Sequence, residues 1–271
     1  MFDWVTEHEM ALRLGMFFGI FFIMALFEGV APRRPLTAPK WFRWLNNLTL
    51  VGLNTFLVRL VFPTALAGVA MYLADNRVGV FNVLDAPLWF SVPLSLILLD
   101  GVIWLQHKTF HEVPLLWRLH RVHHADPDID VTTGSRFHPL EILISMVVKV
   151  VAVTLLGAPA VAVVLFEILL NALAMFNHSN VRLPNRIDRM VRFLVVTPDM
   201  HRIHHSVIPE EYNTNYGFNL ALWDRWFGTY TDKPLHGHLG MEIGLKGCLP
   251  AQATNLASML KMPFLTQAPR S

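Results

Sequence analysis

The stretch Met16–Phe27, which reads MFFGIFFIMALF, is an unbroken run of apolar residues and glycine. It lies inside a longer and mostly apolar run, Met10–Val30, and a helix of about 20 residues is enough to cross the hydrocarbon core of a bilayer. No Lys or Arg precedes Arg13, and no small-residue cleavage site closes the run. A cleaved signal peptide needs a positively charged N-terminal region and a small-residue cleavage site. We therefore interpret this run as a retained membrane anchor.

Four further apolar runs follow along the chain, at Leu48–Ala74, Pro87–Gln106, Ile142–Leu156 and Ala160–Phe176. The tripeptide Gly157-Ala158-Pro159 separates the last two runs, which is typical of a tight helical hairpin. The runs predict an all-α fold, an integral membrane helical bundle of four to five spans. Buried helices of a large soluble protein are the alternative, and the length and hydropathy of the runs favour the membrane.

The composition of the 271 residues agrees with this fold class, because 54% are hydrophobic and only 15% are charged. An ordinary soluble domain carries about 25% charged residues. The net charge of +2 is too near neutral for a phosphate-rich partner, so we expect no nucleic acid. Cys248 is the one cysteine, which excludes an internal disulfide and a thiolate metal site, whereas histidine occurs 13 times.

Lys and Arg alternate between the loops in a way that predicts the orientation of the spans. The segment after the first apolar run contains four Lys and Arg residues, and the segment after the second contains one. Four follow the third run, none follows the fourth, and ten follow the fifth. Since cytoplasmic loops carry the excess of Lys and Arg, we expect the N-terminus outside and the C-terminus in the cytoplasm. The segments Gln106–Pro139 and Asn177–Ser271 then share the cytoplasmic side. We expect a bacterial inner membrane, with the endoplasmic reticulum as the alternative.

Histidines gather in these two segments and at the ends of the spans that lead into them. One HxxxH motif and two HxxHH motifs occur, and a random chain with this histidine content would contain HxxHH roughly 0.03 times. The candidate metal ligands are His107, His111, His120, His123, His124, His138, His178, His201, His204 and His205.

The spacing of these motifs indicates two metal ions close together. On a helix, residues at i, i+3 and i+4 share one face, while an adjacent pair diverges enough to reach two ions. Neutral imidazole binds iron and zinc alike, so the ligand type leaves the metal open. Helix capping or packing is the alternative role for His138 and His178. We interpret His8, His236 and His238, which have no partner pattern, as surface or loop residues.

From Leu98 to Tyr230 the sequence resembles the fatty acid hydroxylase/sterol desaturase superfamily of integral membrane oxygenases. The resemblance rests on the histidine motifs in their order and on Asn215-Tyr216-Gly217, followed by LWDRWFGTY at 222–230. It divides the chain into N-terminal anchor helices at 1–97, a catalytic domain at 98–230 and a C-terminal tail at 231–271. A modestly apolar stretch in that tail, Leu249–Phe264, is compatible with an interfacial helix.

The resemblance implies a membrane bundle with a cytoplasmic cap of histidine-bearing helices. It also implies two iron ions (di-iron) that use dioxygen to hydroxylate or desaturate a C–H bond of a lipid, such as a fatty acyl chain or a sterol. The substrate is then expected to enter from the bilayer. Some members pair the third histidine cluster with another histidine four residues away, and here Ala174 and Arg182 stand in those places.

Polar residues near the histidine motifs are candidates for holding the imidazole tautomers. Asn215 and Asp224 are the two candidates we select for the catalytic centre, beside Glu112, Asp126 and Asp199. For each of them a surface salt bridge or a helix cap is an equally good interpretation. The aromatic side chains of the LWDRWFGTY stretch can line a lipid channel or form an aromatic belt at the membrane interface.

The chain offers no motif for a redox cofactor, because we find no GxGxxG after a strand-like run and no cluster of cysteines. A separate reductase or small carrier protein is therefore expected to supply electrons. Two other functions stay open. A zinc-dependent membrane hydrolase would be expected to carry HExxH, but Leu115 occupies the place of its second histidine. The other is a non-enzymatic metal-binding membrane protein, for example a haem carrier.

Overall fold

The structure is a computed structural model that describes residues 2–265. Within these residues the regular elements are helices, and five helical segments are long and apolar enough to cross a membrane. The long helices are α2 (Glu9–Val30), α3 (Lys40–Val61), α6 (Leu88–Glu112), α8 (Pro139–Leu156) and α9 (Ala160–Asn177). The chain is thus an all-α integral membrane protein, as the sequence predicts.

The second predicted span is the one whose bounds differ clearly. Helix α3 begins at Lys40, eight residues earlier than predicted, and ends at Val61. After a break, α4 (Leu66–Asp75) continues the segment, and the short α5 (Val80–Val83) leads into α6. Pro63 explains the break, because proline restricts the residue before it and lacks the N–H that a continuous helix needs.

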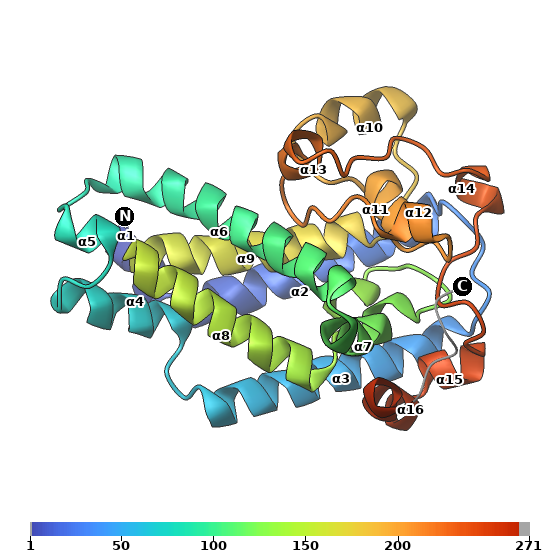
Figure 1. Cartoon of the computed structure of the whole chain (residues 1–271), viewed down its shortest axis with the longest axis horizontal. Coiled ribbons are helices and arrows are strands. Elements are labelled where there is room, and N and C mark those ends of the chain that lie inside the picture. The colour runs from blue at the N-terminus through green and yellow to red at the C-terminus, as the bar shows by residue number, and fades with distance from the viewer. Residues whose placement is uncertain (1, 266–271) are drawn as a thin grey trace.

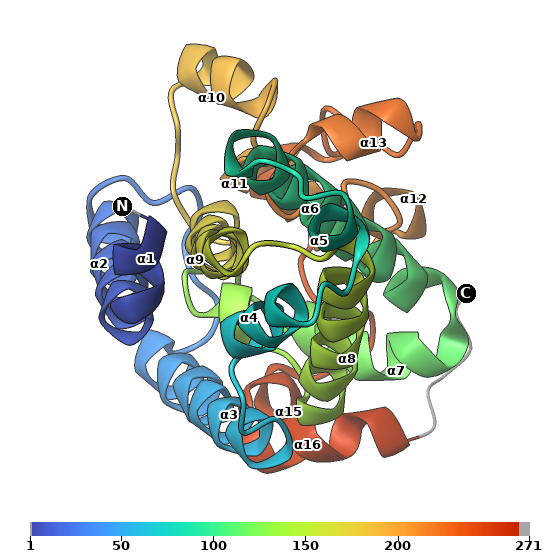
Figure 2. The ribbon, with the colours of Figure 1, turned by 90° about the vertical axis from the view of Figure 1, so that its left-hand side faces the viewer.

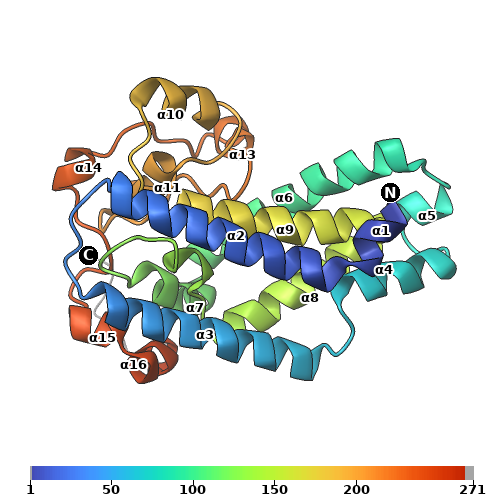
Figure 3. The same ribbon diagram turned by 180° about the vertical axis from the view of Figure 1, so that it is seen from behind.

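Helix α9 occupies the centre of the bundle. It packs against α2, α4 and α6, and Figure 2, which looks along the bundle, shows it between α2 and α6. The N-terminus and the described C-terminal end lie at opposite ends of the bundle in Figure 1. Figure 3 shows α2 and α3 side by side on the rear face. Opposite ends for the termini are what an odd number of spans requires.

Gly157-Ala158-Pro159 forms the tight turn between α8 and α9 that the sequence predicts, although each of these helices packs mainly against other helices, α4 among them. Gly157 follows α8 in the left-handed conformation, with φ 65°. A Cβ there would lie 2.9 Å from the side-chain amide of Asn82, so both the backbone angle and the space require glycine. Helix α8 runs away from the cap, and after the turn α9 runs back toward it (Figure 1).

The cap lies at the end of the bundle remote from the N-terminus (Figure 1). Its helices are α7 (Pro114–His124), α10 (Asn185–Arg192), α11 (Pro198–His204), α12 (Pro209–Tyr212), α13 (Leu222–Trp226), α14 (Gly237–Gly240), α15 (Pro250–Thr254) and α16 (Leu256–Lys261). Helices α15 and α16 pack on α3, and Met259 is fully buried among residues that include Leu50 and Val122. An interfacial position for this tail stays a prediction, as does the division into three domains.

A buried ionic network fastens the cap to α3. Arg43 is fully buried and donates to Asp126 at 2.8 Å and to Asp130 at 2.5 Å. Burial alone would raise the pKa of Asp126, but the guanidinium groups of Arg43 and Arg136 outweigh it and lower that pKa to about 2. Asp126 is therefore ionised at neutral pH, and the loop after α7 is held in one place.

Candidate metal centre

Four helical segments carry the histidines to one place in the cap. Helix α6 ends with His107 and His111, α7 ends with His120, His123 and His124, His178 follows α9, and His201, His204 and His205 lie on or directly after α11. Each of these nine side chains is at most 3% exposed. Thus nine of the ten predicted ligands lie in the interior of the cap.

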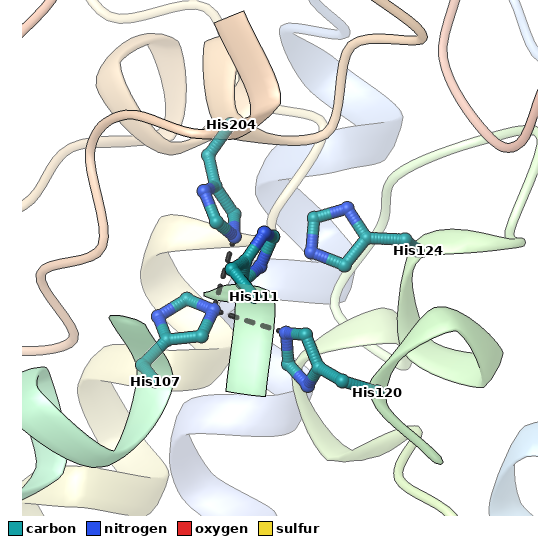
Figure 4. Close-up of side chains that lie close together, drawn as sticks. All are labelled: His107, His111, His120, His124 and His204. Atoms are coloured by element: carbon teal, nitrogen blue, oxygen red, sulfur yellow. Dashed lines mark hydrogen bonds between the residues drawn. The ribbon is translucent and has the colours of Figure 1, made fainter. Parts of the chain in front are cut away.

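The nine imidazoles form two groups, each with one ligand atom per residue and all of these atoms within 4.8 Å of one another. The five-imidazole group is His107, His111, His120, His124 and His204, shown in Figure 4. The four-imidazole group is His123, His178, His201 and His205.

The two HxxHH motifs divide their histidines between the groups in opposite ways. In the first motif, the outer residues His120 and His124 enter the five-imidazole group and His123 enters the other. In the second motif the outer residues join the four-imidazole group, while His204 crosses to the five-imidazole group. The adjacent histidines of each motif thus reach different groups, as the spacing predicts, and the outer pair at i and i+4 stays together.

Backbone carbonyls orient several of the rings. Nδ1 of His107 donates to the carbonyl of Tyr216 at 2.7 Å, and Nδ1 of His204 to that of Thr214 at 2.7 Å. In the other group, Nδ1 of His178 donates to Ala174 at 2.8 Å, and Nδ1 of His123 to Arg136 at 3.2 Å. A carbonyl can only accept, so these contacts place the proton on Nδ1 and leave a lone pair on Nε2.

The Nε2 atoms then face each other at short range. They are 3.0 Å apart for His107 and His204, as the dashed line in Figure 4 shows, and 3.0 Å apart for His178 and His123. With both protons held on Nδ1, no proton lies between these lone pairs. A shared cation removes the repulsion, and two nitrogens bound at about 2.1 Å and at right angles to one ion are about 3.0 Å apart.

The imidazoles of His120, His124 and His178 are neutral at physiological pH, as metal ligands must be. Burial lowers the pKa of His120 to about 3 and that of His178 to about 4. Burial lowers the pKa of His124 well below its usual value too. Among residues 2–265, both ring nitrogens of His205 are buried without a hydrogen-bond partner. The donor set and these unpaired nitrogens fit two metal ions, one in each group.

His138 does not join either group, which corrects the sequence-based expectation of ten converging ligands. It precedes α8, and its Nδ1 accepts from the backbone N–H of Leu140 at 3.2 Å. Its Nε2 lies 3.3 Å from the carbonyl of Leu260 in α16. The ring is used as a helix cap and as a link to the C-terminal helices, which is the alternative that the sequence left open.

Glu141 is a residue of the site that sequence reasoning missed. It lies in the first turn of α8, is 4% exposed, and places Oε1 2.6 Å from Nδ1 of His120. A carboxylate there accepts a hydrogen bond from the Nδ1–H of His120. This bond keeps the proton on Nδ1 and turns Nε2 toward the five-imidazole group. The signal available in the sequence is an acidic residue at the start of an apolar span, three residues after a histidine.

Asp224 contacts the backbone beside one of the candidate ligands. It accepts from the backbone N–H groups of Tyr216 at 2.9 Å and Gly217 at 2.8 Å, and from the indole of Trp104 at 3.0 Å. These bonds fix the Tyr216 carbonyl to which His107 donates. Burial raises the pKa of Asp224 although these donors oppose the rise.

Asn215 also supports the site rather than entering it. It has φ 54°, and its amide nitrogen donates to the carbonyls of Met200 at 3.1 Å and Thr231 at 2.9 Å. Neither Asn215 nor Asp224 belongs to the two imidazole groups. A role for each in positioning the ligands stays a prediction.

The other three polar candidates lie in ion pairs. Glu112 pairs with Lys108 near the surface. Asp126 belongs to the network around Arg43, and Asp199 pairs with Arg33 at 2.9 Å. The contacts of Glu112, Asp126 and Asp199 are therefore those of salt bridges, which is the alternative that the sequence offered.

Comparison with known proteins identifies the class of protein that this site defines. The sequence profile of the fatty acid hydroxylase family matches residues 92–229. The chain is 30% identical over 249 residues to the ornithine lipid hydroxylase OlsE of Rhizobium tropici, and this alignment covers 89% of the chain and 72% of the relative. No solved structure shows a significant match.

Two further relatives align with about half of the chain. The alkylglycerol monooxygenase of Xenopus tropicalis is 30% identical over 51% of the chain and 30% of its own length. The cholesterol 25-hydroxylase of Rattus norvegicus is 27% identical over 53% of the chain and 47% of its own length. The chain thus spans less than half of these two relatives.

The fold and the site define a helical membrane protein with two buried groups of imidazoles that could hold metal ions. The chain belongs to the fatty acid hydroxylase family. It is an oxidoreductase, a membrane oxygenase that hydroxylates C–H bonds of lipids. The zinc hydrolase and the non-enzymatic metal carrier, which the sequence left open, are thereby superseded.

Proposed function

We propose that the chain is a di-iron hydroxylase of a polar acyl lipid of the bacterial inner membrane. The observation that carries the proposal is the convergence of nine buried imidazoles in groups of five and four. The ligands we assign are these nine histidines, with Glu141, Asp224 and Asn215 as positioning residues. Iron bound there supplies the activation of dioxygen that oxidises the C–H bond.

The number of imidazoles supports iron over zinc. Structural zinc is almost always tetrahedral with four ligands, and catalytic zinc keeps three protein ligands and an open position. The five-imidazole group exceeds both counts. An ion that accepts six ligands can use five nitrogens and still bind one small molecule, and imidazole suits ferrous iron.

The relatives support hydroxylation of a lipid rather than desaturation. The relative that aligns with 89% of the chain is an ornithine lipid hydroxylase. The others act by name on alkylglycerol and cholesterol, and they align with a smaller part of the chain. We therefore propose a bacterial lipid with an acylated polar headgroup, of the class to which ornithine lipids belong. The exposed apolar surface of the spans lets such a lipid approach laterally.

The reaction needs two electrons and a defined side of the membrane. Hydroxylation by dioxygen places one oxygen atom in the lipid and reduces the other to water, so a reductant must deliver two electrons. We propose a separate cytoplasmic reductase or carrier protein as their source. The metal centre and the C-terminus are then cytoplasmic and the N-terminus is outside, in agreement with the excess of Lys and Arg in the cap loops.

The proposed activity is tested in a bacterial host that lacks the chain. Cells expressing the chain and cells expressing His204→Ala are grown under isotopically labelled dioxygen, and their lipids are compared by mass spectrometry. We expect a lipid that gains one labelled oxygen atom with the chain and not with the variant. Loss of a hydrogen pair would indicate desaturation, and an oxygen atom from water would contradict the oxygenase mechanism.

The proposed orientation has its own test. Reporter tags placed between Ala74 and Asp85 and at the C-terminus should report opposite sides of the membrane, with the C-terminal tag in the cytoplasm. Tags on the same side would contradict the five-span arrangement. Opposite sides with the C-terminal tag outside would keep the fold and overturn the cytoplasmic location of the metal centre.

A further inference from the structure

Helix α13 lies outside the five spans, yet it packs directly on one of them. The indole of Trp223 donates to Asp100 of α6 at 2.8 Å, and a Cβ on Gly101 would lie 3.0 Å from the ring of Trp223. Phe227, just after α13, stacks on Trp104 of α6 with ring centroids 4.6 Å apart. These contacts fix α13 beside residues 100–104 of the span.

Residues 100–104 of α6 belong to the candidate membrane span Leu88–Glu112. Counting 1.5 Å per residue from Leu88, Trp104 lies about 24 Å along the helix, inside a hydrocarbon core of about 30 Å. Side chains of α13 that point away from α6 therefore face lipid or the headgroup region. Trp226 of α13 is 67% exposed, and Phe227, which follows α13 and stacks on Trp104 with one side of its ring, is still 60% exposed.

Helix α10 extends this apolar surface. A backbone bond from Ala221 to Leu194 at 2.9 Å and a bond from the Arg225 guanidinium to the Arg192 carbonyl at 3.2 Å tie it to α13. Figure 1 shows the two helices next to each other on one side of the cap. The exposed apolar residues of this surface, which we call the α10–α13 face, are Ile187, Met190, Phe193, Leu194, Trp226 and Phe227.

The polar residues of α10 are arranged as in a helix that lies in a membrane surface. Asp188 and Arg192 turn inward and pair at 2.6 Å, and Asp188 also accepts from Thr197 at 2.6 Å. The exposed side chains beside Met190 include Arg186 and Arg189. An apolar face flanked by arginines is typical of helices that insert about 5–10 Å into the headgroup boundary of a bilayer with anionic lipids.

We propose that the α10–α13 face inserts into the leaflet on the metal-site side and anchors the cap to the bilayer. The partner is the lipid surface itself, with apolar side chains among the acyl chains and arginines at anionic headgroups. The face is continuous with the lipid-exposed surface of α6, where Leu105 is 57% exposed. In the sequence, α10 lies between His178 and His201. Insertion of the α10–α13 face would therefore hold the segment that joins these two candidate ligands at the membrane surface.

Spin labels placed on the full-length protein test this contact. The Cys248→Ser background removes the native cysteine, and single variants Met190→Cys, Phe193→Cys and Trp226→Cys carry the label. Glu210→Cys on α12, an exposed site of the cap, is the matched control. The proteins are placed in nanodiscs of phosphatidylethanolamine and phosphatidylglycerol, and label accessibility to dioxygen and to a water-soluble nickel chelate is measured.

We expect the labels at the three face positions to be relaxed mainly by dioxygen, at a depth of about 5–10 Å below the headgroups. The label at Glu210 should be relaxed mainly by the nickel chelate. Equal nickel accessibility at all four positions would overturn the proposal. Dipolar coupling between labels on separate chains at Met190 would also overturn it, because a second copy of the chain would then cover the face.

Discussion

The five-imidazole and four-imidazole groups are built differently, although each takes residues from both HxxHH motifs. The first receives His107 and His111 from the end of a membrane span and touches the carboxylate of Glu141. The second receives His178 from the end of α9. Ala174, four residues before His178, supplies a carbonyl where some family members place a histidine.

We propose that ions bound in the two groups would have separate roles. For a six-coordinate ion, five protein nitrogens leave one free position and four leave two. We infer that the five-imidazole group holds its ion more rigidly and that the four-imidazole group is more open to exogenous ligands.

Loss of one ligand from either group should have the largest effect. His204→Ala opens the five-imidazole group and His123→Ala the four-imidazole group, and each should lower lipid hydroxylation by more than about 100-fold. Metal analysis should show the ion lost first from the altered group. His236→Ala, at an exposed position, is the control. Full activity in either ligand variant would contradict the assignment.

Removal of the Glu141 carboxylate should affect the five-imidazole group alone. Glu141→Gln replaces the acceptor for Nδ1 of His120, and such changes cost about 10–100-fold in metal affinity. Competition with a chelator should release one ion more easily and leave the other unchanged. Glu112→Gln, which alters only a pair near the surface, should match the wild type. Equal weakening of both ions would refute the local role.

Acid should destabilise the metal-free protein. Burial lowers the pKa of His178 to about 4 and that of His120 to about 3, while both return to about 6.5 on unfolding. Between pH 6.5 and 4 the unfolded state binds more protons, so the free energy of unfolding falls as the pH falls. Thermal unfolding in detergent should show a lower Tm at pH 5 than at pH 7.5. A Tm that rises on acidification would contradict these shifts.

His138 should give the smallest effect. His138→Ala removes an acceptor at the start of α8, and loss of a helix cap costs about 1 kcal/mol. Thermal unfolding should report a modest fall in Tm, with the metal content and the activity retained. Loss of an ion from this variant would restore the sequence-based view that His138 is a ligand.

The sequence predicts the features that depend on local spacing. Apolar length determines the spans, and the adjacency of His123 and His124 sends them to different groups. The hairpin at Gly157 follows from its breaker residues. In each case the required information lies within a few residues of the chain.

Features that depend on contacts between distant segments were not predictable. Glu141 is recognised only once α8 packs beside α7, and His138 is seen as a cap only once α16 lies next to it. Pro63 is visible in the sequence, but the length of the apolar run Leu48–Ala74 predicts one continuous span where the structure has a break. Docking of α13 on α6 likewise requires the fold.

The central claim is that the nine imidazoles bind two iron ions. The direct measurement is the metal content of the full-length protein, purified anaerobically from cells that can take up both iron and zinc, with the wild type and His123→Ala analysed in parallel. We expect about two iron ions per chain in the wild type and about one in the variant. Stoichiometric zinc in place of iron, or a wild-type chain that binds a single ion, would contradict it.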